Sequence, residues 1–234
     1  MNILVANYPD FLAGHQGNVI IWKDGTHMPF DDGIQNKSFP DLVNQPSIKD
    51  MFYTPYKSGR QTLPPALNID PGRVRNEAFF LKMYGDCRKG GEPKGMVDVI
   101  WLPHKWGKKL RVTKINRMAD ALTKVSLELD RLPSKYDIFL FPSAGTVNCR
   151  VIAGTHRLSA HATGTAIDIS TARTNYWQWE KPDGNGLYPW KNAIPQEVVD
   201  VFERHGFIWG GKWYHYDTMH FEYRPELIAA GERH

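Results

Sequence analysis

The most regular hydrophobic pattern in the chain lies between Arg117 and Leu132. Apolar residues recur there at intervals of three and four positions: Met118, Ala121, Leu122, Val125, Leu129 and Leu132. Side chains with this spacing share one face of an α-helix, so the pattern predicts a helix that packs its apolar face on a sheet. A second helix is predicted from Gln196 to His205, because Gly206 follows as a stop signal.

Short apolar runs bounded by turn residues predict strands. A hairpin is predicted from Asn18 to Phe30, with Asp24 and Gly25 in its turn. A helix is predicted from Asp70 to Tyr84, with Asp70 as its N-cap and Pro71 at its first position. Further strands are predicted at Met96–Leu102, Leu110–Ile115, Tyr136–Phe141, Val147–Ala153, Ala166–Ser170 and Met219–Tyr223.

The order of these elements predicts the fold class. Helices and strands alternate irregularly, and the connections are too short for repeated parallel crossovers. We therefore expect an α+β fold with a mostly antiparallel sheet and packed helices. The chain has 234 residues without a fixed-period repeat or a linker, which predicts a single domain over 1–234. Within it we expect an elaborated N-terminal wrap over 1–108 and a core over 109–228.

Composition and charge exclude several function classes. The residues are 41% hydrophobic and 23% charged, which is ordinary for a globular protein. A net charge of +4 is too weak to indicate a nucleic-acid partner. No apolar run is long enough to predict a membrane span. The first residues do not resemble a secretory signal, so we expect either an intracellular protein or a signal that was removed.

The two cysteines allow two interpretations. Cys87 and Cys149 can form one disulfide or remain two thiols, and their spacing matches no paired metal-binding motif. We expect them to have a structural role.

His161 and Asp168 are the first candidate metal ligands. They lie seven positions apart, so they would face opposite sides of one regular strand. Gly164 lies between them and can supply the turn that lets both point at one ion. Asp168 also interrupts an apolar run, where an aspartate is costly unless it is paired or coordinated.

His220 completes the candidate set. It is embedded in another apolar strand signal, between Met219 and Phe221. Two imidazoles and one carboxylate form a usual catalytic zinc set, with a fourth position for water. Asp217 precedes His220 by three residues, where a general base for that water is needed. Glu222 shares strand parity with His220 and either orients it or forms a surface ion pair.

The remaining histidines are not expected to bind the metal. His156 and His215 each precede a candidate ligand by five positions, so they would point the other way on a regular strand. The others have no acidic or histidine partner at ligand spacing: His15, His27, His104, His205 and His234.

The two motifs together resemble a known peptidase family. The first reads SxHxxGxAxD and the second DxxHFE. This combination is similar to the zinc D-Ala-D-Ala carboxypeptidase and dipeptidase family, which includes vancomycin-resistance D,D-peptidases and phage L-alanyl-D-glutamate endolysins. The resemblance covers about Val112 to Glu226, and it implies a D,D-peptidase-like fold that hedgehog signalling domains share.

The resemblance implies roles for individual residues. His161, Asp168 and His220 correspond to the ligands of one Zn²⁺ ion, and Asp217 to the catalytic acid and base. Some family members carry Glu at the position of Asp217. The family also uses an upstream arginine to hold a substrate carbonyl or carboxylate.

Arg150 is the preferred match for that arginine, because it lies in a predicted strand leading towards the site, and a guanidinium forms paired hydrogen bonds with a carboxylate. Arg157 is the alternative. Ser159 matches the serine of the first motif and either contacts substrate or caps a turn.

Aromatic residues are dense between the predicted ligands. Most of those from Tyr176 to Trp190 are expected to fill the core and brace loops. The segment Trp209–Trp213 contains two adjacent glycines that permit close backbone approach. We expect Trp213 to contact substrate at a cleft rim.

The resemblance implies a zinc metallopeptidase core over 109–228 that hydrolyses stem peptides of peptidoglycan. D-alanyl-D-alanine carboxypeptidase is the leading hypothesis, and L-alanyl-D-glutamate endopeptidase is the second. The third is a non-catalytic, zinc-containing binding or signalling module. The substrate implies a periplasmic or cell-envelope location, and we expect a monomer.

Overall fold

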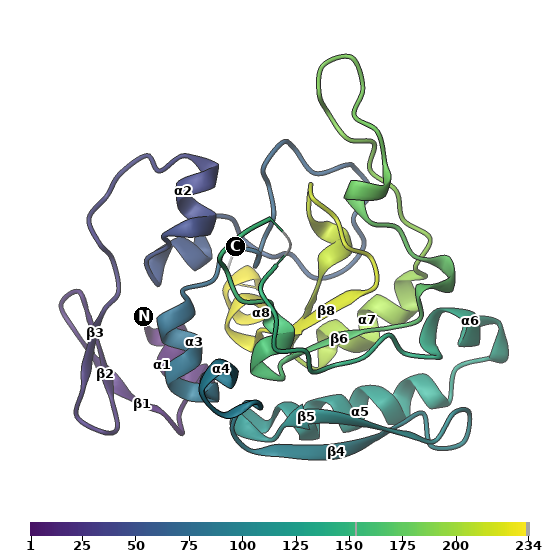
Figure 1. Ribbon diagram of the computed structural model, residues 1–234, viewed down its shortest axis with the longest axis horizontal. Helices are drawn as coiled ribbons and strands as arrows, with labels where there is room; N and C mark the ends of the chain where they lie inside the picture. The colour runs from purple at the N-terminus through teal and green to yellow at the C-terminus, as the bar shows by residue number, and fades with distance from the viewer. Residues whose placement is uncertain (153, 233–234) are drawn as a thin grey trace.

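The computed structural model describes residues 1–152 and 154–232. Within these residues the fold is α+β, as predicted, with helices around small sheets whose strand pairs are all antiparallel. The N-terminal elements lie at one end of the molecule, and most of the later helices and sheets lie at the other (Figure 1).

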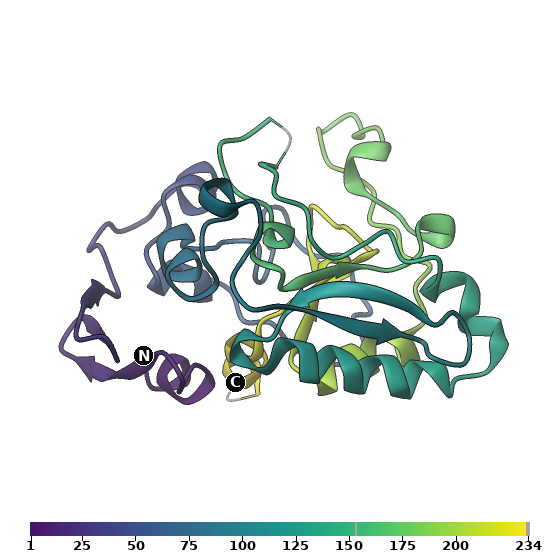
Figure 2. The same cartoon turned by 60° about the horizontal axis from the view of Figure 1, so that its bottom comes forward.

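The predicted amphipathic helix organises the larger hydrophobic core. Helix α5 (Met118–Asp130) packs on the hairpin of β4 (Met96–Trp101) and β5 (Lys108–Thr113), and it contacts α7 (Gln196–Arg204). Figure 2 shows α5 running along one side of this hairpin. The buried residues of its apolar face are Met118, Leu122, Val125 and Leu129. The two predicted helices and the two strands predicted at Met96–Leu102 and Leu110–Ile115 are therefore confirmed.

A three-stranded sheet lies in the same core. Its order is β6 (Ala166–Asp168), β8 (His220–Tyr223) and β7 (Phe207–Trp209). In the register of β6 and β8, Asp168 lies directly opposite His220. Phe221 of β8 stacks on Phe202 of α7 with a ring separation of 3.8 Å. Packing beneath the sheet therefore fixes the strand that carries His220.

The N-terminal elements form a smaller core of their own. Helix α1 (Asn2–Asn7) is followed by β1 (Leu12–Gln16), β2 (Val19–Trp22) and β3 (His27–Pro29). The strands β2 and β3 confirm the predicted hairpin. Buried apolar residues of α1, β1 and β2 pack against helix α3 (Glu77–Tyr84).

The two ends of the chain meet. Helix α1 contacts α8 (Pro225–Gly231), and the Tyr8 hydroxyl donates a hydrogen bond of 2.5 Å to the Glu226 carboxylate. The remaining helices are short: α2 (Phe39–Asn44), α4 (Cys87–Gly90) and α6 (Asp137–Leu140). Single 3-10 turns are η1 (Lys49–Phe52), η2 (Ile115–Arg117), η3 (Ser134–Tyr136), η4 (Ala160–Thr163), η5 (Thr171–Arg173), η6 (Trp177–Trp179) and η7 (Gly210–Lys212).

The predicted start of a helix at Asp70 is wrong. Helix α3 begins at Glu77, with the Asn76 side chain accepting the hydrogen bond of its N-cap. Gly72 has φ of +94°, which is incompatible with a right-handed helix. The Asp70 carboxylate instead accepts a hydrogen bond from the backbone N–H of His215 and contacts its ring.

Two predicted strands are also wrong. Tyr136–Phe141 forms η3 and α6, because a short apolar run between prolines suits a helical turn as well as a strand. In Val147–Ala153 the described residues form a single bridge, from Val151 to Leu158, and Ala153 lies outside the described residues. Helices α1 and α8 and strands β1 and β7 are not predicted by the hydrophobic pattern, because all four are short.

Cys87 and Cys149 form a disulfide. It joins α4 to the irregular segment that carries Arg150, across 62 positions of sequence. Of the two interpretations left open by the sequence, the structure supports the cross-link.

Cys149→Ser is expected to lower the free energy of unfolding by about 4 kcal/mol, because the unfolded chain regains the freedom of a loop of this length. Urea unfolding under non-reducing conditions measures the change. Cys87→Ser should give the same value, since both variants break one bond. Equal stability of the variants and the unaltered chain would contradict a structural role for the disulfide.

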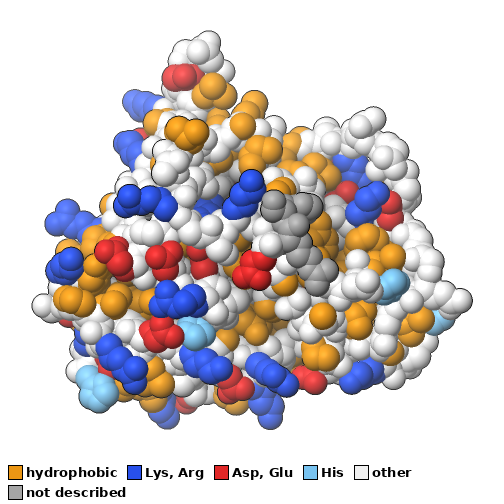
Figure 3. Space-filling view, turned by 180° about the vertical axis from the view of Figure 1, so that it is seen from behind, with side chains coloured by type: hydrophobic (Ala, Val, Ile, Leu, Met, Phe, Trp, Pro, Cys, Tyr) orange, Lys and Arg blue, Asp and Glu red, His pale blue; other side chains and the backbone are white. Residues whose placement is uncertain are grey.

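The single domain and the boundary between residues 108 and 109 stay predictions. Strand β4 lies before that boundary, and it pairs with β5. No helix among the described residues combines the length and apolarity needed to cross a bilayer. On the face shown in Figure 3, basic and acidic side chains are interspersed.

Candidate metal centre

A tight turn positions His161. The Ser159 side chain caps η4 by accepting a hydrogen bond of 3.3 Å from the His161 backbone N–H. Gly164 ends this turn with φ of +71°, and a Cβ there would lie 3.1 Å from the backbone nitrogen of Thr113. A left-handed conformation with so little space favours glycine. The chain then reverses into β6, as expected from Gly164.

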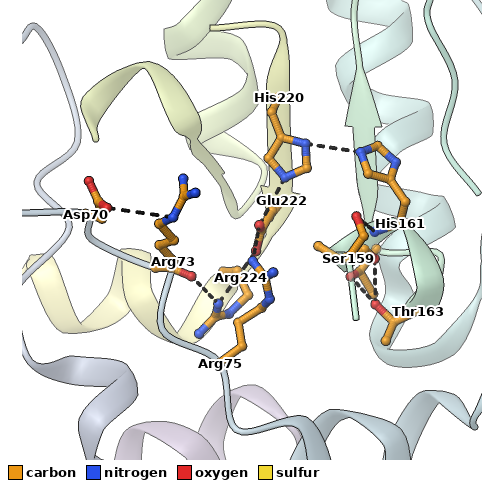
Figure 4. Close-up of polar contacts among 12 residues, drawn as sticks. Asp70, Arg73, Arg75, Ser159, His161, Thr163, His220, Glu222 and Arg224 are labelled. Atoms are coloured by element: carbon orange, nitrogen blue, oxygen red, sulfur yellow. Dashed lines mark hydrogen bonds and ion pairs between the residues drawn. The ribbon is translucent and has the colours of Figure 1, made fainter. Parts of the chain in front are cut away.

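The structure brings the three predicted ligands together. His161 Nε2 lies 3.2 Å from His220 Nδ1, and these two rings face each other in Figure 4. The Asp168 carboxylate lies 2.8 Å from His220 Nδ1 and 3.3 Å from His161 Nε2. Both histidines are buried. These three residues could hold a metal ion.

The hydrogen bonds of the two rings suit metal binding. His161 Nδ1 lies 2.7 Å from the Thr146 carbonyl oxygen, so this nitrogen donates and Nε2 keeps its lone pair. His220 Nε2 lies 3.0 Å from Glu222, which leaves Nδ1 unprotonated in the neutral ring. Ligands about 2.0–2.1 Å from a tetrahedral zinc ion lie about 3.3 Å apart. The observed separations therefore fit a two-histidine, one-aspartate site.

Opposing charges surround His220. Burial lowers its pKa, but the Asp168 and Glu222 carboxylates outweigh that effect and raise the pKa to about 10. Burial raises the pKa of Asp168, but its contacts with His161 and His220 outweigh burial and hold that pKa below its usual range. The pocket thus stabilises positive charge at the position where the metal ligands converge.

Glu222 supports His220 from within the protein. Its side chain is 1% exposed, and it accepts a hydrogen bond of 2.6 Å from Arg75 as well as the contact from His220. Burial raises the pKa of Glu222, but Arg75 and His220 have the larger, opposite effect and lower this pKa to about 2. Of the two sequence interpretations, a surface ion pair is therefore excluded by burial. An ionised carboxylate behind a ligating histidine fixes the ring and raises its basicity.

Glu222→Gln is expected to weaken zinc binding by about 10–100-fold, because the amide holds the His220 ring less strongly. Competition with a chromophoric chelator measures the affinity. Glu92→Gln, at an exposed carboxylate that pairs with Arg111, is the matched control and should leave zinc affinity unchanged. Zinc affinity as high in the Glu222 variant as in the control would show that this contact does not support the ligand.

Asp217 lies at the entrance to β8. Its backbone is held by a hydrogen bond of 3.0 Å from its N–H to the Gly210 carbonyl. Burial raises the pKa of its side chain to about 6, with His220 lowering and Asp168 raising it to smaller extents. Its Oδ1 is buried and has no hydrogen-bond partner among the described residues. The buried Oδ1 therefore lacks a protein partner in the described part of the chain, and the effects of His220 and Asp168 on the pKa place this carboxylate close to the cluster.

Gly210 packs against the backbone of Asp217, and Trp213 lies beside His220. A Cβ at Gly210 would lie 2.6 Å from the Asp217 carbonyl oxygen, so glycine permits the close approach of the two segments. Trp213 is 3% exposed, donates to the Pro71 carbonyl oxygen, and has its ring 5.9 Å from that of His220. The ring supports the histidine, and its contact with substrate stays a prediction.

The two candidate arginines are placed differently. Arg150 is exposed, in an irregular segment rather than the predicted strand, and its Nη1 makes a long contact of 3.5 Å with the Val151 carbonyl oxygen. Arg157 is half-buried and lines a cavity near Ser159. Among the described residues, neither guanidinium forms a hydrogen bond or ion pair with the three candidate ligands.

The other histidines lie outside the cluster. His215 contacts Asp70, and His156 is exposed on the segment beside the cavity. His104 and His205 do have carboxylate partners, contrary to the expectation from sequence spacing, because Asp130 and Glu128 approach them only in the folded chain.

Sequence reasoning missed Arg73 and Arg75. Arg75 pairs with Glu222, and Arg73 donates a hydrogen bond of 3.0 Å to the His215 carbonyl oxygen. Val74 separates the two arginines, and residues two positions apart in an extended segment point to the same side. The prediction of a helix over this stretch hid that signal.

A buried His-Asp-His group beside an unpartnered carboxylate, in an α+β fold, defines a candidate metal-dependent hydrolase. Residues 153–223 match the model of the family described as D-alanyl-D-alanine carboxypeptidase. The match covers less than a third of the chain and contains His161, Asp168, Asp217, His220 and Glu222. This segment therefore resembles that peptidase family, which confirms the predicted resemblance. No curated protein and no solved structure matches the chain significantly.

Proposed function

We propose that the protein is a zinc peptidase that removes the terminal D-alanine from peptidoglycan stem peptides. The observation that carries this proposal is the convergence of His161, Asp168 and His220 within the segment that matches the carboxypeptidase family. The adjacent Asp217 carboxylate favours an enzyme over a binding module, because binding a metal does not require a second, unpartnered acid.

His161 Nε2, His220 Nδ1 and the Asp168 carboxylate would hold one Zn²⁺ ion. When bound, the ion polarises the scissile carbonyl group and lowers the pKa of an attacking water to about 7. Thr146 and Glu222 keep the two rings in the orientation and protonation state that this requires.

Asp217 moves the proton. Its carboxylate accepts a proton from the attacking water and delivers it to the nitrogen of the leaving D-alanine. With a pKa of about 6, the group is largely ionised at neutral pH and is a sufficiently weak acid to hold the proton between the two steps.

Arg150 and Ser159 would bind the substrate. The Arg150 carbonyl oxygen accepts a hydrogen bond of 3.0 Å from the Ser159 N–H, so the backbone of Arg150 is anchored beside the turn that carries His161. Its exposed guanidinium is available to hold the substrate carbonyl or terminal carboxylate. Because peptidoglycan lies outside the cytoplasm, we place the protein in the periplasm or cell envelope; its predicted monomeric state belongs to the same proposal.

Mass spectrometry of muropeptides and a synthetic pentapeptide stem tests this function. The purified protein is incubated with each substrate as prepared, after chelation, and after zinc is restored. Loss of one terminal alanine that disappears on chelation and returns with zinc is the expected result. A cut between L-Ala and D-Glu would replace the carboxypeptidase by an endopeptidase. Stoichiometric zinc without any cleavage would overturn catalysis and favour a binding module.

A further inference from the structure

The turn that carries His161 is held by a neighbouring segment, residues 146–150, which forms neither a helix nor a strand. His161 Nδ1 donates a hydrogen bond of 2.7 Å to the Thr146 carbonyl oxygen. The Asn148 N–H donates one of 3.3 Å to the His161 carbonyl oxygen. Figure 4 shows the ring of His161 facing that of His220. Residues 146–150 therefore hold both the backbone and the imidazole ring of this candidate ligand.

Apolar burial does little to hold residues 146–150 in place. Thr146 is buried, but the three residues at the end of the segment are exposed: Asn148, Cys149 and Arg150. The Arg150 carbonyl oxygen accepts a hydrogen bond of 3.0 Å from the Ser159 N–H. Backbone hydrogen bonds near the surface add little net stability, because water competes for the same groups. An exposed segment with these contacts needs a further constraint to keep one position.

The disulfide between Cys87 and Cys149 supplies that constraint. Cys149 lies within residues 146–150, between the two residues whose backbones bond to the turn. Its partner Cys87 is 1% exposed, belongs to α4, and packs in a small apolar cluster with Ala162. Ala162 follows His161 in η4. The disulfide therefore acts on this turn from two sides, through a backbone segment and through an apolar contact.

We propose that the disulfide positions the metal ligand His161, so that full zinc affinity requires the intact cross-link. The identity of the metal rests on the proposed function. Without the bond, residues 146–150 gain freedom and the Thr146 carbonyl group no longer holds the imidazole in one orientation. Loss of such a support for a ligating histidine typically weakens metal binding by about 10–100-fold. Both cysteines lie outside residues 153–223, so a part of the chain beyond the family match supports the metal centre.

The zinc affinity of the double variant Cys87→Ser/Cys149→Ser tests this role. Competition with a chromophoric chelator should show zinc binding at least about tenfold weaker than in the unaltered chain. Both cysteines are replaced because a single free thiol can itself bind zinc. An affinity equal to that of the unaltered chain would overturn the positioning role.

Ile20→Ala is the control for a general loss of stability. Ile20 is fully buried in the N-terminal core, so its truncation should lower the urea midpoint substantially, as loss of the disulfide does. Zinc affinity is compared under conditions in which circular dichroism shows each variant to be folded. The control should bind zinc as the unaltered chain does. An equal loss of affinity in the control would overturn positioning, because instability alone would then explain the effect.

The ring proton of His161 gives a second readout in the unaltered chain, without zinc. The buried Nδ1–H that donates to Thr146 should give a downfield NMR signal that exchanges slowly with water, assigned by its absence in His161→Gln. Reduction of the disulfide should broaden or remove this signal, and reoxidation should restore it. A signal that is unchanged on reduction would overturn the proposal, even where the serine variant fails to fold.

These measurements are separate from turnover. If muropeptides are cleaved but zinc affinity does not depend on the disulfide, the positioning role fails and the proposed function remains. If no muropeptide is cleaved but the His161 signal depends on the disulfide, the proposed function fails and the positioning of His161 remains.

Discussion

Asp217→Asn is expected to retain zinc and to lose at least about 100-fold in kcat for release of the terminal alanine. The amide has nearly the same size as the carboxylate but cannot accept the proton of the attacking water. Because Asp217 Oδ1 has no hydrogen-bond partner among the described residues, the substitution breaks no hydrogen bond of that atom. Steady-state kinetics with a pentapeptide stem, alongside metal analysis, measures both properties.

Asp10→Asn is the matched control, since Asp10 is an exposed aspartate in the N-terminal part of the chain. This control should keep the kcat of the unaltered protein. Unchanged turnover in the Asp217 variant would remove Asp217 from the mechanism. Simultaneous loss of zinc would show that the carboxylate acts on the metal rather than on the proton.

His220→Ala is expected to abolish both zinc binding and hydrolysis. The substitution removes one of three candidate ligands and leaves Asp168 without the ring that faces it across β6 and β8. After dialysis against a weak chelator, the zinc content should fall from about one ion to less than a tenth of an ion per chain. Inductively coupled plasma mass spectrometry gives the metal content, and the pentapeptide assay gives the activity.

His27→Ala provides the comparison, because His27 is an exposed histidine of β3. It should bind zinc and cleave peptide as the unaltered chain does. Full zinc content in the His220 variant would place the metal elsewhere. The two large effects also distinguish two roles, since Asp217→Asn should separate metal binding from catalysis and His220→Ala should remove both.

The longest local patterns predicted secondary structure well. The apolar spacing from Met118 to Leu129 needs only one face of a helix to be buried, and α5 forms there. Short apolar runs were less informative, because about six residues carry too little periodicity to separate a strand from a helical turn. Tyr136–Phe141 is the example: it reads as a strand and folds as η3 and α6.

Long-range partners account for the failure at Asp70. In sequence, an aspartate before a proline is a good helix N-cap. In the folded chain its carboxylate contacts His215, which is 145 positions away. Such a partner competes with the local cap, and nothing near Asp70 in the sequence indicates it.

The two sequence motifs were sufficient to identify the candidate residues of the metal centre and the candidate proton carrier. Both motifs are short, and a turn at Gly164 and the alternation of one strand are enough to orient their side chains. Three other relations became visible in the folded chain: Glu222 is buried behind His220, Cys87 pairs with Cys149, and Arg73 and Arg157 line one cavity. These relations join segments more than 60 positions apart or depend on what covers a side chain. Packing of the whole chain determines which distant segments meet and which side chains are covered. The spacing of residues along the sequence predicts neither.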